Sequence, residues 1–193
     1  LVRTIRFRHA LGVTARPCVE SLFGALLAVK LRQVTAGITI RNHRYPMDWN
    51  RNPILLVEDN AGDADLTLMA LNRQGLGKRV VHMRDGVDAL DYLHRRGVYQ
   101  DNRDQSPVVM FLDLKMPMFD GFAVIREVRA SERLRHIPIV VLTASNEPGD
   151  RQRAYADGAN AYLCKPLDFV EFMEAMRCTC QFWVQLNQRA EPS

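Results

Sequence analysis

Several features that would place a chain in a special class are missing from these 193 residues. The longest apolar run, residues 22–29, is too short to cross a bilayer, so no membrane-spanning helix is expected. There is no internal repeat and no low-complexity tract, which excludes repeat and fibrous architectures. The four cysteines match no zinc-binding spacing and indicate reduced thiols of a cytoplasmic protein: Cys18, Cys164, Cys178 and Cys180.

Acidic residues are nearly missing from the first 46 positions, which hold eight of the 26 Lys and Arg residues but only Glu20 among the 22 acids. The rest of the chain is slightly acidic, so the net charge of +4 gives no reason to expect a nucleic-acid partner. Methionine is also absent before Met47. We expect residues 1–46 to be a basic N-terminal extension outside the fold, upstream of the natural start or added to it. A targeting or membrane-surface arm is the alternative.

Beyond Pro53 the chain alternates apolar strands with amphipathic helices five times. This alternation predicts an α/β fold with a parallel sheet and right-handed crossovers. The predicted strands are 54–57, 79–83, 108–112, 139–142 and 161–163, and the predicted helices are 61–74, 87–95, 122–130, 148–156 and a last helix from 169 onward. In that last helix the residues expected to face inward are Phe169, Met173, Met176, Cys180 and Trp183.

Polar side chains follow four of these strands at the point where each strand ends. They are Glu58 and Asp59, Asp113, Thr143, and Lys165. The carboxyl ends of parallel strands share one edge of the sheet, where three uncompensated carboxylates would repel one another. Mg²⁺ prefers carboxylate oxygens and would relieve that repulsion. A hydroxyl and an ammonium opposite the metal suit a phosphoryl group, which makes Asp113 a candidate nucleophile that forms an aspartyl phosphate.

The motifs at these strand ends resemble those of a response-regulator receiver domain (CheY-like) over about residues 53–186. They are V-E-D-N at the first strand end, L-D-L-K-M-P-M-F-D-G around Asp113, V-V-L-T-A-S around Thr143 and Y-L-C-K-P around Lys165. The spacings from Asp59 through these residues, 54, 30 and 22, are also similar. The resemblance implies a flavodoxin-like three-layer sandwich, with five helices around a five-stranded parallel sheet of order 2-1-3-4-5.

The resemblance also implies a metal site and a phosphoryl acceptor. Glu58, Asp59, Asp113 and the backbone carbonyl of Lys115 would bind Mg²⁺. Asp113 would accept a phosphoryl group from the phosphohistidine of a sensor histidine kinase.

A second group of residues would respond to that phosphoryl group. Thr143 and Lys165 would hold its oxygens, and Tyr162 would swing inward when Thr143 moves. A cis peptide bond between Lys165 and Pro166 would aim the ammonium at the site.

Within the family, the chain most resembles stand-alone receivers that partner bacterial phytochromes and related histidine kinases. This finer resemblance lies in the polar loop 97–107, the V-E-D-N-x-G-D start and the extended final helix with Phe182 and Trp183. Lys115 departs from the Asn often found two residues after the acceptor, and Ser145 replaces an acidic residue sometimes present two after the Thr. Both positions flank the approach of hydrolytic water, so we expect them to tune the phosphoryl lifetime.

These features predict that residues 47–193 form a single-domain response regulator with an extended C-terminal helix, which signals by protein contact and is not an enzyme. The face of helix 148–156, strand 161–163 and the last helix would change its partner affinity, and Phe182 and Trp183 would contribute to a homodimer or partner surface. Four arginines are expected on a solvated face: Arg126, Arg129, Arg133 and Arg135.

Two other functions fit part of the pattern. A phosphatase or phosphotransferase of the haloacid-dehalogenase class also forms an aspartyl phosphate, but it needs a second acid where Lys115 stands. A receiver-like scaffold that is never phosphorylated is the other alternative.

Overall fold

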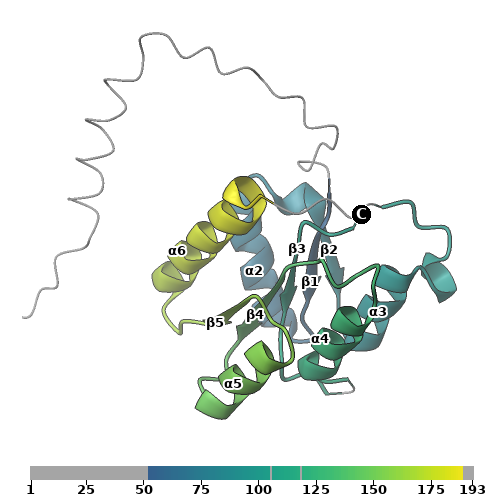
Figure 1. Cartoon of the computed structure of the whole chain (residues 1–193). Coiled ribbons are helices and arrows are strands. Elements are labelled where there is room, and N and C mark those ends of the chain that lie inside the picture. Colours follow the sequence, from purple (N-terminus) through teal and green to yellow (C-terminus); the bar gives the residue numbers. More distant parts are fainter. Residues whose placement is uncertain (1–51, 105, 118, 189–193) are drawn as a thin grey trace, which may run out of the picture. The chain divides into compact units, whose positions relative to one another are not determined.

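The computed structural model describes residues 52–104, 106–117 and 119–188. Their centre is a parallel sheet in the order β2-β1-β3-β4-β5 (Figure 1). The strands are β1 Ile54–Val57, β2 Val80–Met83, β3 Val109–Leu112, β4 Ile139–Thr143 and β5 Ala161–Cys164. The prediction for residues 1–46 lies outside the described residues.

Five helices cover the two faces of the sheet, and the described elements begin and end within one residue of their predicted bounds. They are α2 Ala61–Arg73, α3 Gly86–His94, α4 Gly121–Ala130, α5 Pro148–Ala156 and α6 Phe169–Cys180. Short 3₁₀ turns occur at η2 Gly77–Arg79 and η3 Gly97–Tyr99, and α6 continues into the π-helical η4 Gln181–Leu186. Among the described residues no helix has the length and apolar content needed to cross a membrane.

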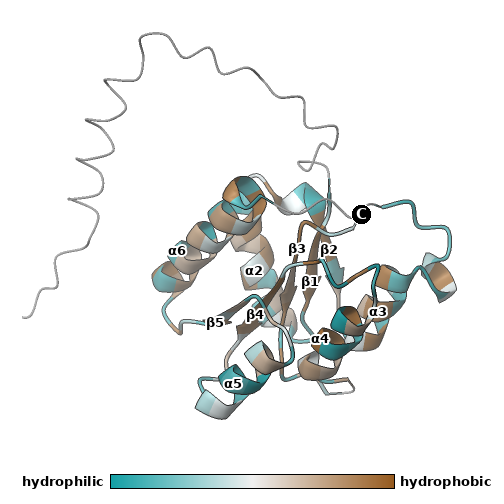
Figure 2. Cartoon of the chain, viewed as in Figure 1, coloured by the Kyte–Doolittle hydropathy of each residue, from teal (hydrophilic) through white to brown (hydrophobic). Residues whose placement is uncertain are grey.

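The side chains of each central strand alternate between two hydrophobic cores, one on each face of the sheet. Met110 and Leu112 of β3 join the core under α3 and α4, whereas Val109 and Phe111 join the core under α2 and α6. In Figure 2 the strands are coloured as hydrophobic, whereas the helices that cover them mix hydrophobic and hydrophilic residues. The predicted flavodoxin-like, three-layer fold is therefore confirmed, with the predicted strand order.

The predicted inward stripe of the last helix is only partly correct. Met176 and Cys180 are buried, but Phe169 is 43% exposed and Phe172 is buried in its place. Phe172, Met176 and Cys180 follow one another at four-residue steps along one line of the helix. Phe169 stands at the first helical position, where its ring lies under the guanidinium of Arg73 at 5.5 Å.

Candidate functional site

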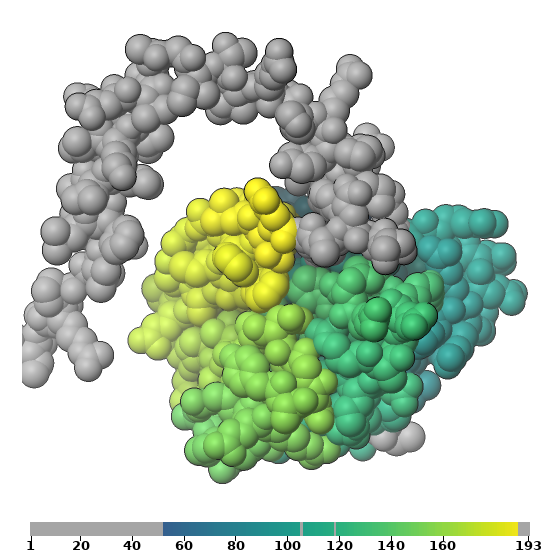
Figure 3. Space-filling view, in the orientation of Figure 1, coloured from purple at the N-terminus to yellow at the C-terminus, as the bar shows by residue number. Residues whose placement is uncertain are grey.

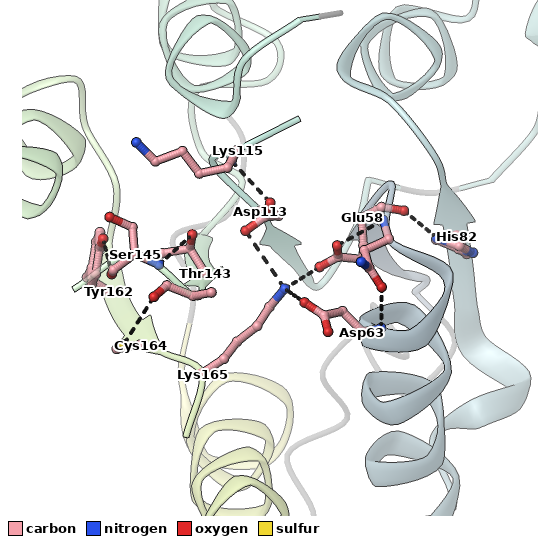
Figure 4. Close-up of polar contacts among 12 residues, drawn as sticks. Glu58, Asp63, His82, Asp113, Lys115, Thr143, Ser145, Tyr162, Cys164 and Lys165 are labelled. Carbon is pink, nitrogen blue, oxygen red and sulfur yellow. Dashed lines mark hydrogen bonds and ion pairs between the residues drawn. The ribbon is translucent and has the colours of Figure 1, made fainter. Parts of the chain in front are cut away.

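The carboxyl edge of the sheet brings together the polar residues that follow β1, β3, β4 and β5. β1 pairs with β3 so that Val57 lies opposite Leu112, and the Asp113 N–H donates to the Val57 carbonyl at 3.0 Å. At the other side of the site the Lys165 N–H donates to the Thr143 carbonyl at 2.7 Å. Backbone pairing thus positions the predicted residues beside one another (Figure 4).

Three carboxylates at this edge have the chemistry of a divalent metal site. Glu58, Asp59 and Asp113 each offer one oxygen, and these atoms lie within 4.8 Å of one another. Glu58 is only 2% exposed, and burial raises the pKa of its carboxyl despite the opposing effect of Lys165. A hard divalent cation fits this donor set because its positive charge would balance the negative charges of the crowded carboxylates.

Lys115 contacts Asp113 through its backbone. Its N–H donates to Asp113 Oδ2 at 3.1 Å, which orients the carboxylate at the strand end. The role predicted for the Lys115 carbonyl in metal binding stays a prediction.

Lys165 lies among the acids, as the sequence predicts. Its Nζ is 2.6 Å from Glu58 Oε2, 2.7 Å from Asp63 Oδ2 and 3.8 Å from Asp113 Oδ1 (Figure 4). Burial by itself would lower the pKa of this ammonium, but the hydrogen bonds to Asp63 and Glu58 outweigh it, and the pKa is raised. The side chain is 10% exposed, so a positive charge is held inside the acidic cluster.

The prediction of a cis peptide bond between Lys165 and Pro166 is wrong, because no peptide bond among the described residues is cis. The ammonium reaches the acids from a trans bond, the form that X–Pro bonds favour by about 0.5–1 kcal/mol. The two carboxylate contacts of Lys165 hold the side chain at the site without the cis bond.

Thr143 is buried at the end of β4, and its Oγ1 accepts the Ser145 N–H at 3.3 Å. The Tyr162 hydroxyl donates to the Ser145 carbonyl at 2.8 Å. The loop after β4 therefore connects the predicted phosphoryl contact with the predicted switch aromatic. Movement of Tyr162 stays a prediction.

Two acidic residues of this region had no role in the sequence-based prediction. Asp63 pairs with Lys165, and Asp150 of α5 pairs with Lys115 Nζ at 2.7 Å while accepting the Ser145 hydroxyl at 2.6 Å. The contact with Lys115 is the first cause of a lowered pKa of Asp150. Asp150 therefore connects the two positions that flank the predicted approach of hydrolytic water.

A sequence signal for Asp63 and Asp150 does exist. Each lies at the third residue of its helix, in the turn that follows a site strand. The sequence shows their placement, but side chains that leave the helix to meet a distant lysine are visible only in the fold.

Two of the four arginines predicted on a solvated face donate hydrogen bonds to backbone carbonyls in other parts of the fold. Arg129 donates to the carbonyls of Gly158 at 2.8 Å and Ile137 at 2.9 Å, and to Asn160 Oδ1 at 2.7 Å. Arg133 donates to the Leu93 carbonyl. The solvated-face prediction is therefore wrong for Arg129, which is partly buried because loop carbonyls next to α4 need donors, whereas Arg133 is exposed as predicted.

The C-terminal segment carries exposed apolar side chains. Phe182 is 50% exposed and meets Trp183 edge-to-face at 4.9 Å, while Trp183 packs against the core under α6. Leu167, Val170 and Leu186 are also exposed. Figure 3 shows the outer surfaces of α5 (green) and of α6 with η4 (yellow) on the same side of the molecule. The dimer stays a prediction.

Comparison with known proteins gives one family. Residues 54–177 match the family model described as response regulator receiver domain. The chain is 39% identical over 140 residues to the probable methanogenesis regulatory protein FilR2 of Methanothrix harundinacea, covering 72% of this chain and 88% of the relative. It is 31% identical over 132 residues to response regulator Rcp1 of Synechocystis, covering 68% and 88%.

Solved structures of response regulators are also similar to this chain. The Mn²⁺-bound form of Rcp1 is similar with a TM-score of 0.66 and 29% identity, covering 72% of this chain and 99% of that one. The bacteriophytochrome response regulator AtBRR is 47% identical with a TM-score of 0.58, covering 71% and 98%.

Proposed function

The chain belongs to the response regulator receiver family, a family of signalling modules rather than classical enzymes, and from this premise we propose that Asp113 accepts a phosphoryl group from a sensor histidine kinase. The phosphorylated chain then signals by protein–protein contact as a single-domain response regulator of a two-component phosphorelay. The observation that carries the proposal is the position of Asp113: its carboxylate lies within 4.8 Å of those of Glu58 and Asp59 and 3.8 Å from the Lys165 ammonium.

In the proposed transfer, an Asp113 oxygen attacks the phosphorus of the phosphohistidine. The new O–P bond forms as the P–N bond breaks, and the electron pair of that bond returns to the imidazole nitrogen. Lys165 donates to a phosphoryl oxygen and offsets its charge. Glu58, Asp59 and Asp113 would hold a divalent ion, which we propose is Mg²⁺; the ion supplies neutralisation of negative charge when bound.

The output is proposed to pass through the loop after β4. Thr143 would donate its hydroxyl to a phosphoryl oxygen, and the hydrogen bond from Tyr162 to Ser145 would carry the shift of the loop to β5. The face of α5, β5 and α6 then meets a downstream protein or a second copy of the chain.

The input is proposed to come from a phytochrome-type histidine kinase in the cytoplasm. Support comes from the 47% identity to a bacteriophytochrome response regulator.

Intact-mass measurement after treatment with acetyl phosphate and Mg²⁺ tests the proposal. We expect the mass of one phosphoryl group on the wild-type chain and none on Asp113→Asn. No added mass on the wild type would instead favour an unphosphorylated scaffold, and addition undiminished in Asp113→Asn would place the acceptor elsewhere.

A further inference from the structure

Asp63 contacts the site from a position where a helix cap is the ordinary expectation. It is the third residue of α2, and an acid there commonly accepts the backbone N–H of the N-cap residue. That residue is Asn60, and Glu58 Oε1 already accepts its N–H at 3.2 Å. The Asp63 carboxylate instead contacts Lys165 Nζ at 2.7 Å (Figure 4).

Two of the three N–H donors of the Lys165 ammonium are used by the carboxylates of Glu58 and Asp63. Glu58 Oε2 takes one at 2.6 Å and Asp63 Oδ2 takes another. Asp113 Oδ1 lies 3.8 Å away, beyond hydrogen-bond distance, so one donor remains for an oxygen bound to Asp113. The two acids thus orient the ammonium toward the acceptor.

The two anchors of Lys165 are not equivalent when the site is in use. Glu58 belongs to the trio of carboxylates suited to a divalent ion, whereas Asp63 does not. An ion that draws on the Glu58 carboxylate weakens its bond to the ammonium, because both cations compete for the same charge. Asp63 then becomes the main partner of Lys165.

We propose that Asp63 is a positioning residue for phosphoryl transfer: it holds the Lys165 ammonium beside Asp113 while Glu58 is engaged by the divalent ion. This inference rests on the proposed function. Without Asp63, Lys165 has no second anchor, and its long side chain samples positions that do not reach the phosphoryl oxygens.

Phosphorylation rates of matched variants test the role of Asp63, with acetyl phosphate as donor, Mg²⁺ present and intact mass as readout. Asp63→Ala is expected to lower the rate about fivefold, the effect of losing one charge-assisted hydrogen bond at a partly exposed carboxylate. Asp63→Asn retains an acceptor oxygen and should restore most of that loss. Asp65→Ala, which removes an exposed acid from the same helix, should leave the rate at the wild-type value.

Two further measurements separate positioning from a general effect on the helix. In a Lys165→Met background, verified as folded by circular dichroism, Asp63→Ala should have no additional effect on the rate, because its action passes through Lys165. Exchange of the Lys165 ammonium protons with water, followed by ¹⁵N NMR, should be faster in Asp63→Ala than in the wild type when Mg²⁺ is bound. Without metal the two proteins should differ much less, because Glu58 still accepts from the ammonium.

The role of Asp63 is refuted if Asp63→Ala is phosphorylated as fast as the wild type or faster, if Asp65→Ala slows equally, or if the exchange of the ammonium protons with Mg²⁺ bound is the same in Asp63→Ala as in the wild type. The role is also refuted if Asp63→Ala slows phosphorylation in the Lys165→Met background as much as it does in the wild type. Absence of phosphoryl mass on the wild type would refute the proposed function itself, so the two failures are distinguishable.

Discussion

Replacement of Lys165 by Met removes the positive charge from the acidic cluster and should destabilise the metal-free fold. The ammonium is the partner of Glu58, which is buried, and of Asp63, and it also lies near Asp113. Met retains the volume of the side chain, so the loss is electrostatic. Breaking a buried ion pair by removing one partner typically costs about 3–5 kcal/mol.

The structure sets an upper limit on this cost, because Glu58 can take up a proton instead of remaining a buried charge. Its ordinary pKa is 4.5, and each pKa unit corresponds to about 1.36 kcal/mol, so protonation at pH 7 costs about 3.4 kcal/mol. We therefore expect Lys165→Met to lower the free energy of unfolding by about 3 kcal/mol at pH 7.

The stability lost in Lys165→Met should also depend on pH. Burial already raises the pKa of Glu58, and loss of Lys165 removes the two largest effects that lower it. A carboxyl whose pKa is higher in the folded than in the unfolded state favours folding when protonated, so its contribution to stability falls as pH rises above 4.5. At pH 5 the protonation of Glu58 costs less than about 1 kcal/mol. The difference between wild type and variant should shrink accordingly.

Urea unfolding followed by circular dichroism, in chelator-containing buffer at pH 5 and pH 7, measures both quantities. Lys78→Met, at an exposed lysine of η2, is the matched control and should stay within about 0.5 kcal/mol of the wild type. Added Mg²⁺ should stabilise Lys165→Met more than the wild type, because Glu58 no longer has a competing cation. A loss below about 1 kcal/mol at pH 7, or an equal loss at both pH values, would contradict the reasoning.

Three further predictions follow from contacts around the site. Asp150→Ala should shorten the phosphoryl lifetime about threefold, measured as decay of the added mass. The Lys115 side chain, no longer held by Asp150, would leave the path by which water approaches, and an unchanged lifetime would contradict this. Arg129→Met should lower the free energy of unfolding by about 2–4 kcal/mol in urea, whereas the exposed Arg126→Met should cost under about 1 kcal/mol. Phe182→Ala should shift a sedimenting dimer toward monomer, and a monomer in both proteins would exclude the dimer.

The sheet could be predicted because each central strand carries its own signal. The apolar runs ending at Val57, Leu112 and Leu142 are buried on both faces of the sheet, so every residue in them is apolar. The last helix was predicted less well. Its apolar residues allow more than one inward line, and contact with α2 and the sheet selects the line through Phe172.

The site was predictable to the extent that strand ends determine it. Glu58, Asp113 and Thr143 are placed by parallel pairing alone, because the register of β1, β3 and β4 sets their relative positions. The cis or trans state of the Lys165–Pro166 bond is not determined by strand pairing. The bond between Lys165 and Pro166 is trans, whereas the family resemblance implied cis.

Asp63 and Asp150 show where sequence reasoning stops at this site. Each is a first-turn acid, for which the helix dipole is a sufficient local explanation. What the fold adds is a lysine from elsewhere in the chain: Lys165 from beyond β5 for Asp63, and Lys115 from beyond β3 for Asp150. Each lysine is far from its acid in the sequence, and only the arrangement of strands and helices brings the two together. These two acids therefore extend the site from the strand ends, where pairing positions it, to the helices α2 and α5.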